Sequence, residues 1–250
     1  MINTVRNAVL ALLNKHNYGY LAPGDFNMYA KLAQLDMFRH LFDRYNEILL
    51  KENLRESGIE YAGLNEKITR AIDRFVVPLT SLDHVTDNEF SLPSTITVGH
   101  EMYKPISVSC YDASVTPKVY KGEAEITSLS VIQGLRRSML MAPSGVFPVV
   151  AMASSSLFAY PEDIFTDDGA IEMAYIRYPV EPRWTYISLS GGEPIFNPST
   201  GDYADFELDP SFEIELVIKI CQYAGIEVRE ADVYGFAKGE ELQSKNIQQK

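Results

Sequence analysis

The chain has 250 residues, of which 46% are hydrophobic and 22% charged, and its formal net charge is −12. This length and composition exclude wholesale disorder and allow a core large enough to fold without disulfides. A surface this acidic repels phosphate groups, so we expect no sequence-specific binding of nucleic acid.

Helical periodicity runs through the first 75 residues. Apolar residues recur at spacings of three and four over residues 5–13, which predicts a first helix. Pro23 can open a second helix, because the N–H that proline lacks has no intrahelical partner at that position. Its apolar stripe continues to about Asn53, which gives about 30 residues and a length of roughly 45 Å. A third helix is expected over residues 64–75.

The apolar stripe of the second helix is the first candidate for a binding surface. A chain of this size has a limited core against which to hide so long a stripe, and large exposed apolar patches usually mark interaction sites. We therefore expect part of the stripe to be left for a neighbouring subunit, with Phe38 and Phe42 as candidate interface residues.

The character of the chain changes near Phe75. Residues 1–74 carry 10 Lys/Arg and 9 Asp/Glu, a net charge of +1, whereas residues 75–250 carry 12 and 25, a net charge of −13. Of the 13 prolines, only Pro23 precedes residue 75. The sequence therefore predicts an organisational boundary at this point.

Strand and turn signals dominate residues 76–197. Runs of β-branched and aromatic residues, bounded by Pro, Gly, Asp and Ser, predict short strands. They cover residues 76–77, 106–110, 119–130, 145–153, 173–178 and 186–189. Residues 190–193 are a candidate hairpin turn that leads into Ile195-Phe196, and residues 131–141 are a candidate for an inserted helix.

Helical signals return towards the C-terminal end. Asp209 is a candidate helix cap, Pro210 a candidate first residue and Gly225 a candidate end. Residues 240–250 are polar enough to form a loose tail.

Together these signals predict an α+β fold with three parts. The parts are an N-terminal long-helix unit over residues 1–75, a central antiparallel β-rich body over residues 76–208, and a C-terminal helix with a polar tail over residues 209–250.

Residues that carry metal chemistry are sparse and scattered. Four histidines are present, namely His16, His40, His84 and His100. No pair of them has the i, i+4 spacing or the nearby cysteines of a zinc site. Asp202, Asp205 and Asp209 depart from the spacing of a calcium loop, and a polar loop followed by a helix cap explains them more simply.

Sequence motifs of catalysis are equally absent. There is no Gly-rich phosphate loop, dinucleotide fingerprint or nucleophile elbow in the sequence. Ser144 and the serines at 154–156 have no base at a defined spacing, and Asp167-Asp168-Gly169 has the composition of a turn. We therefore expect no metal, no cofactor and no enzymatic activity.

Cysteine usage and hydropathy bear on the location of the chain. Cys110 and Cys221 lie far apart in apolar stretches, which favours buried reduced thiols over a disulfide framework. No stretch approaches the ~20 consecutive apolar residues of a membrane span. The apolar run in residues 1–13 lacks a cleavage site and reads as a helix of the mature protein. These features predict a chain that is made in a cytoplasm, stays there until assembly and binds no membrane.

Residues 175–186 form the second candidate binding surface. Within them, Tyr175, Tyr178, Arg183 and Trp184 are of the types that anchor protein interfaces. Packing inside a core or a hairpin accounts for the same residues equally well, so the sequence leaves both interpretations open.

Two stretches of the chain resemble the ends of a known family. One is residues 19–27, GYLAPGDFN, with matching positions up to Tyr45. The other is residues 205–210, DFELDP, with matching positions up to Ile226. In these stretches the chain resembles virion structural proteins of crAss-like and related podovirus-like bacteriophages. Gly24-Asp25 departs from the family pattern, which weakens the start of the helix, and residues 76–200 carry no resemblance.

The resemblance implies a component of the neck or tail of a virion, made in the cytoplasm of a bacterial host. Such a head-to-tail connector or tail protein assembles as a homo-oligomeric ring with cyclic symmetry below the portal, where it contacts the portal and other ring or tail proteins. Two alternatives stay open. One is a tail-fibre adaptor or a capsid-decorating virion protein, and the other is a cytoplasmic enzyme whose site is built from scattered residues.

Overall fold

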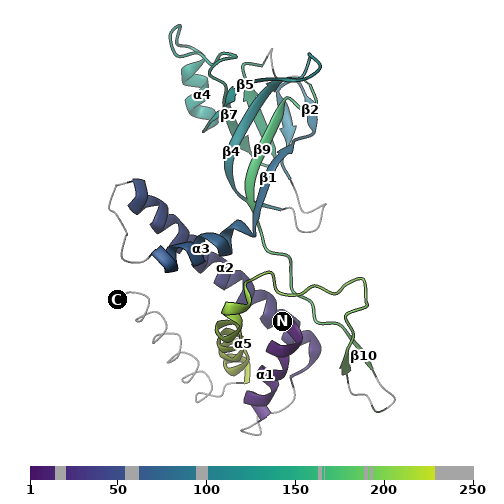
Figure 1. Ribbon diagram of the computed structural model, residues 1–250. Coiled ribbons are helices and arrows are strands. Elements are labelled where there is room, and N and C mark those ends of the chain that lie inside the picture. Colours follow the sequence, from purple (N-terminus) through teal and green to yellow (C-terminus); the bar gives the residue numbers. More distant parts are fainter. Residues whose placement is uncertain are drawn as a thin grey trace. The chain divides into compact units, whose positions relative to one another are not determined.

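The computed structural model describes residues 1–14, 21–53, 62–93, 101–162, 165, 167–188, 191 and 194–228 (Figure 1). The fold is α+β, with helices towards both ends of the chain and strands between them. The chain divides into two compact units. We call Met1–Arg74 together with Pro179–Lys250 the helical unit, and Phe75–Tyr178 the β unit.

This division differs from the expected β-rich body over residues 76–208. The change near Phe75 coincides with the start of the β unit, but residues 179–208 belong to the helical unit. Hydrogen bonds explain the difference, because the buried Gln34 of the long helix binds the backbone of this returning segment at both Val180 and Glu207. The helical unit is therefore built from both sides of an inserted β unit.

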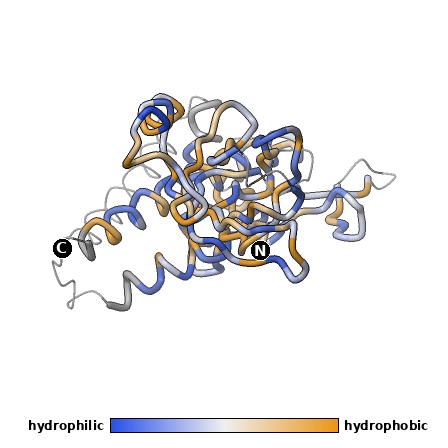
Figure 2. The backbone as a smooth tube through the Cα atoms, turned by 90° about the horizontal axis from the view of Figure 1, so that it is seen from above, coloured by the Kyte–Doolittle hydropathy of each residue, from blue (hydrophilic) through white to orange (hydrophobic). Residues whose placement is uncertain are grey.

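The helical unit contains α1 (Ile2–Asn14), α2 (Pro23–Asn53), α3 (Ala62–Asp73) and α5 (Glu213–Val228). Helix α2 packs against α3 and α5, and α1 packs against α5. Helix α2 has the predicted length and is unbroken. Figure 2 shows hydrophobic and hydrophilic residues alternating along the helices, as amphipathic helices require. The buried side includes Phe26, Ala33 and Phe38 of α2 and Leu216 and Ile220 of α5.

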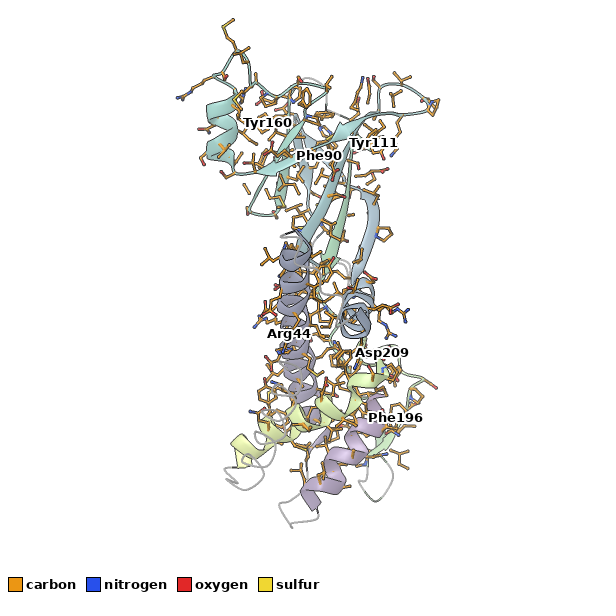
Figure 3. All side chains as sticks on the ribbon, turned by 60° about the vertical axis from the view of Figure 1, so that its left-hand side comes forward. Arg44, Phe90, Tyr111, Tyr160, Phe196 and Asp209 are labelled. Carbon is orange, nitrogen blue, oxygen red and sulfur yellow. The ribbon has the colours of Figure 1, made fainter. Side chains whose placement is uncertain are left out.

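Helix α5 follows a short 3₁₀ turn, η2 (Pro210–Phe212), whose cap is the predicted one. The Asp209 side chain accepts a hydrogen bond from the backbone N–H of Ser211 and forms an ion pair with Arg74 (Figure 3). The predicted end at Gly225 is wrong, since α5 continues to Val228. Gly225 is buried, so packing of the helix outweighs the conformational preference of glycine.

The helical unit also holds the predicted hairpin. Strands β10 (Tyr186–Ser188) and β11 (Pro194–Phe196) pair antiparallel, with Ile187 directly opposite Ile195. Of the predicted turn at 190–193, only Gly191 lies within the described residues.

The β unit contains two sheets among its described residues. One has the order β1 (Val76–Ser81), β9 (Ile171–Arg177), β4 (Met102–Asp112), β5 (Val119–Glu123). The other has the order β2 (His84–Thr86), β3 (Glu89–Ser91), β8 (Ser156–Tyr160), β7 (Val149–Ala153), β6 (Glu125–Thr127). Pairing is antiparallel except between β6 and β7, which run parallel.

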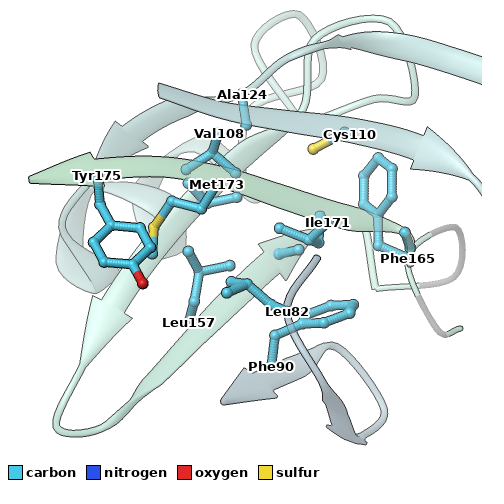
Figure 4. Packing of buried hydrophobic residues seen from close by; sticks show 13 residues of the cluster. Leu82, Phe90, Val108, Cys110, Ala124, Leu157, Phe165, Ile171, Met173 and Tyr175 are labelled. Carbon is cyan, nitrogen blue, oxygen red and sulfur yellow. The ribbon is translucent and has the colours of Figure 1, made fainter. Parts of the chain in front are cut away.

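The two sheets are joined at both edges by chain segments that bend from one sheet into the other. Strand β1 leads into β2 past Leu82, whose N–H donates to the Ile171 carbonyl. Strand β5 leads into β6 past Ala124, whose N–H donates to the Val108 carbonyl. The side chains of Leu82, Ala124 and Val108 all belong to the core between the sheets, which also contains Phe90 and Met173 (Figure 4). Bent edge strands of this kind leave few exposed sheet edges.

Three strands of the β unit, β2, β3 and β8, were not predicted from the sequence. Strands β2 and β3 have three residues each and contain His84 and Glu89, so they carry no apolar run. The predicted helix at 131–141 is in fact α4, which is shorter and ends at Leu135 (Leu129–Leu135). Its buried Ile132 packs on Val149 of β7, on the opposite face of that strand from the main core.

Candidate protein-binding surfaces

The structure places four of the six predicted interface residues in the interior of the chain. Phe38 and Phe42 of α2 are buried and stack with ring centroids 6.5 Å apart. Tyr175 of β9 lies in the core of the β unit, opposite Val77 of β1. Trp184 is buried in the helical unit. None of these four side chains is presented to a partner.

Trp184 is buried because several groups of α1 and α2 hold it. Its ring N–H donates to Asn3 Oδ1 at 3.1 Å, and its backbone N–H donates to Asn27 Oδ1 at 2.8 Å. Asn27 Nδ2 in turn donates to the Trp184 carbonyl. The Arg6 guanidinium lies over the indole, 3.9 Å from the ring centroid. The tryptophan thus anchors the returning segment to the helices.

The other two predicted interface residues, Tyr178 and Arg183, keep surface exposure. Tyr178 is half-buried, and its ring meets Tyr103 edge-on with centroids 4.9 Å apart. Arg183 is exposed and lies 3.4 Å from the Asp202 carboxylate. Both have intramolecular partners, so neither stands out as an anchor for another protein.

Asp205 and Asp209 have structural roles, as the cap interpretation predicted. Asp205 accepts hydrogen bonds from the α-amino group of Met1 and from the N–H groups of Ile2 and Phe206. Burial raises the pKa of this carboxyl, but the hydrogen bonds outweigh burial and hold the pKa below its ordinary value. The carboxylate therefore caps α1 from the far end of the sequence.

The apolar feature that contains the most exposed of the large hydrophobic side chains described was not predicted from the sequence. We call it the apolar tip, and it comprises Met139, Leu140, Met141, Val146 and Phe147, in the loop between α4 and β7 of the β unit. Met139 and Leu140 are fully open to solvent, at 102% and 97% of their reference surface, and Phe147 is at 74%. A run of Met-Leu-Met beside Pro143 and Gly145, with no polar alternation, was the sequence signal that could have found it.

The loop that carries the apolar tip is fixed at several points. Ser144 and Phe147 exchange two backbone hydrogen bonds, at 3.2 and 3.0 Å. At the start of the loop, Arg136 forms an ion pair with Glu162 at 2.9 Å, and its guanidinium lies over the ring of Tyr160 (Figure 3). The tip is thus presented on an anchored loop, which lowers the entropy cost of binding.

A second exposed apolar surface lies on the hairpin of the helical unit. Ile187 and Ile195 face each other across β10 and β11 and are 58% and 48% exposed. We call this pair the hairpin face. On the neighbouring positions, Tyr186 and Phe196 stack on the buried Trp184. One face of the hairpin is thereby held by the unit and the other is left to solvent.

No metal-binding cluster of three or more His, Cys, Asp or Glu occurs among the described residues. His84 Nε2 lies 2.8 Å from the Asp87 carbonyl, and the His84 ring packs against Phe90. His16 and His100 lie outside the described residues. Gly169 occupies the predicted turn with a φ of 80°.

Both cysteines are buried free thiols, as predicted. Burial raises the pKa of Cys110 to about 12 and that of Cys221 to about 11. Neither thiol is therefore a nucleophile in the folded chain. Ser154, one of the serines noted in the sequence, lies in the tight turn between β7 and β8 with a φ of 56°.

Comparison with known proteins gives no match to any family model or to any curated protein. Among the described residues, no helix is both long and apolar enough to span a bilayer. The surfaces therefore have to be interpreted from their own chemistry, which is that of exposed apolar side chains.

Proposed function

We propose that the chain is a structural component of a tailed phage virion, a ring-forming head-to-tail connector or tail protein below the portal. It acts by binding other protein subunits and has no catalytic role. The observation behind the proposal is the apolar tip, whose large side chains are 66–102% exposed on an anchored loop. Exposed apolar patches of this kind usually mark sites of interaction with another protein. The likeness of residues 19–45 and 205–226 to virion proteins supports the particular setting.

The energy of the apolar tip favours a closed assembly over a simple pair. Burying one such side chain contributes roughly 1.5–3 kcal/mol, so five contribute about 8–15 kcal/mol if all are buried. Association itself costs an estimated ~4–15 kcal/mol. For a single contact, the free energy gained by burial is therefore close to the free energy lost on association. A closed ring of N subunits makes N contacts for N − 1 association steps, so closure adds one contact without a further association cost.

The presence of unlike apolar surfaces on one chain also supports a ring. Cyclic assemblies use heterologous contacts, in which one surface of a subunit meets a different surface of the next. The apolar tip lies on the β unit and the hairpin face on the helical unit, so each chain offers two chemically different contacts.

Electron microscopy of purified virions, with mass spectrometry to identify the subunits, tests the proposal. We expect several copies of the chain in one closed ring, each in contact with its like neighbours through more than roughly 1,000 Å² of buried surface. Isolated copies without like-to-like contacts would replace this proposal by a tail-fibre adaptor or a capsid-decorating protein. A chain absent from virions would reject both.

A further inference from the structure

We propose that the apolar tip of one copy docks on the hairpin face of a second copy of this chain. This inference rests on the proposed function and names the two surfaces that meet in the ring. Both are exposed and apolar, and neither is covered by a described residue of its own chain. What selects this pairing over the alternatives is charge.

The segment that carries the apolar tip is slightly basic, although the protein as a whole is acidic. Residues 126–162 contain two arginines, Arg136 and Arg137, and one carboxylate, Glu162, which gives a net charge of +1 although the whole chain has a net charge of −12. Arg136 is engaged with Glu162. Arg137 is exposed and forms no ion pair with any described residue, and it stands two positions before Met139. The tip is therefore both apolar and cationic.

The segment that carries the hairpin face has the opposite charge. Residues 179–209 contain six Asp/Glu and one Arg, a net charge of −5, and the segment keeps a net charge of −2 when the three cations that pair with its carboxylates, Lys31, Arg74 and the α-amino group of Met1, are included. Asp202 of this segment is 70% exposed at its side chain and lies 3.4 Å from Arg183, its one ion-pair partner among the residues that the structure describes. The neighbouring Tyr203 packs edge-on against Phe196 of β11, which places this acidic stretch beside the hairpin.

These charges disfavour the two symmetric arrangements. A tip-to-tip contact would bring the Arg137 side chains of two copies together, and a hairpin-to-hairpin contact would bring two acidic segments together. Like charges brought together at an interface oppose association. A tip-to-hairpin contact joins opposite charges and buries apolar side chains from both sides. It is also heterologous, as a ring requires.

Cysteine cross-linking tests the contact directly, because the buried native thiols do not compete. Chains that carry Leu140→Cys and chains of different tagged mass that carry Ile187→Cys are purified, mixed and treated with a short bis-maleimide. Both positions are exposed, so neither substitution disturbs a core. Chains with Val115→Cys, another exposed apolar position of the β unit, serve as the control.

We expect the adduct between the Leu140→Cys and Ile187→Cys chains to dominate, with little adduct to the control. Adding Arg137→Glu to the Leu140→Cys chain should lower the yield severalfold, whereas Arg137→Lys should preserve it. A dominant adduct between two Leu140→Cys chains, or no adduct above the control, would overturn the contact. If virions nevertheless contain a closed ring of this chain, only the tip-to-hairpin contact fails and the proposed function stands.

Discussion

The segment around Trp184 and the apolar tip have similar compositions, but the first is buried and the second is exposed to solvent. Both contain large apolar residues close to arginine, but Trp184 is buried under groups of α1 and α2 while Met139 and Leu140 stand in solvent. The difference is in the available partners, because the returning segment lies along two helices and the loop after α4 has only its base anchored. A segment rich in aromatic residues and arginine can therefore belong to the core, as that around Trp184 does. A candidate binding surface has to be identified by the exposure of its side chains.

The sharpest way to test this contrast is to truncate one residue from each region. Trp184→Ala removes a buried ring together with its contacts to Asn3 and Arg6, so we expect a loss of about 3–5 kcal/mol in the free energy of unfolding. Leu140→Ala in the apolar tip should change it by about 0.5 kcal/mol or less. Urea unfolding followed by circular dichroism measures both. Equal losses would remove the distinction between core and surface.

A smaller effect is expected where the returning segment meets α2. Gln34→Ala deletes the amide that donates to the Val180 carbonyl and accepts from the Glu207 N–H, and leaves two part-buried backbone groups unpaired. We expect a loss of about 1–3 kcal/mol in the free energy of unfolding. The exposed Gln133→Ala is the matched control and should cost much less. Equal costs would show that Gln34 does not hold the segment.

The cap of α1 provides a pH-dependent comparison within the same unit. Because hydrogen bonds hold the folded-state pKa of Asp205 below its ordinary value, the charged form is the one that stabilises the fold. This stabilisation is complete above the ordinary carboxyl pKa of about 4 and is lost as the pH falls through the lower folded-state pKa.

Asp205→Asn keeps one oxygen, which can accept from the N–H groups of Ile2 and Phe206, but removes the charge. The stability gap between the native chain and this variant, about 0.3–2 kcal/mol at neutral pH, should close in acid. Thermal unfolding from pH 7 to pH 2 measures it. A gap that stays constant over this range would mean that the charge of Asp205 plays no part.

The smallest effect is expected for the reaction of the two buried thiols with a labelling reagent. With pKa values raised to about 12 and about 11 by burial, Cys110 and Cys221 should not react with a thiol reagent at pH 8 in the folded chain. Both should react once the chain is unfolded in guanidinium. Rapid labelling of either thiol under native conditions would place it at the surface.

The elements that could be predicted from the sequence are those marked by neighbouring residues, such as an apolar stripe or a helix cap. The apolar stripe that begins at Pro23 gave α2 with correct bounds, and Asp209 gave the cap of the last helix. Strand β3 escaped because its three residues owe their position to pairing with β8, a contact between distant parts of the sequence. The membership of residues 179–208 in the helical unit depends on Gln34, which has no local signature.

The candidate surfaces show the same limit more strongly. Phe42 and Trp184 have the composition of interface anchors, but their burial depends on which helices pack on them. Met139 and Leu140 have the composition of a helix that continues, but the chain leaves the helix at Leu135 and no residue in the described parts of the chain covers them. Exposure is a property of the folded chain, so periodicity alone does not reveal it.

Electron microscopy of virions that carry either the native chain or Phe147→Asp tests whether this chain assembles with copies of itself through the apolar tip. Phe147 is exposed, so its substitution leaves the core intact. We expect a closed ring of native chains with residues 139–147 buried between neighbours, and loss of that ring in the variant. Native rings in which the tip stays exposed, or unchanged rings in the variant, would show that the chain does not assemble through the apolar tip.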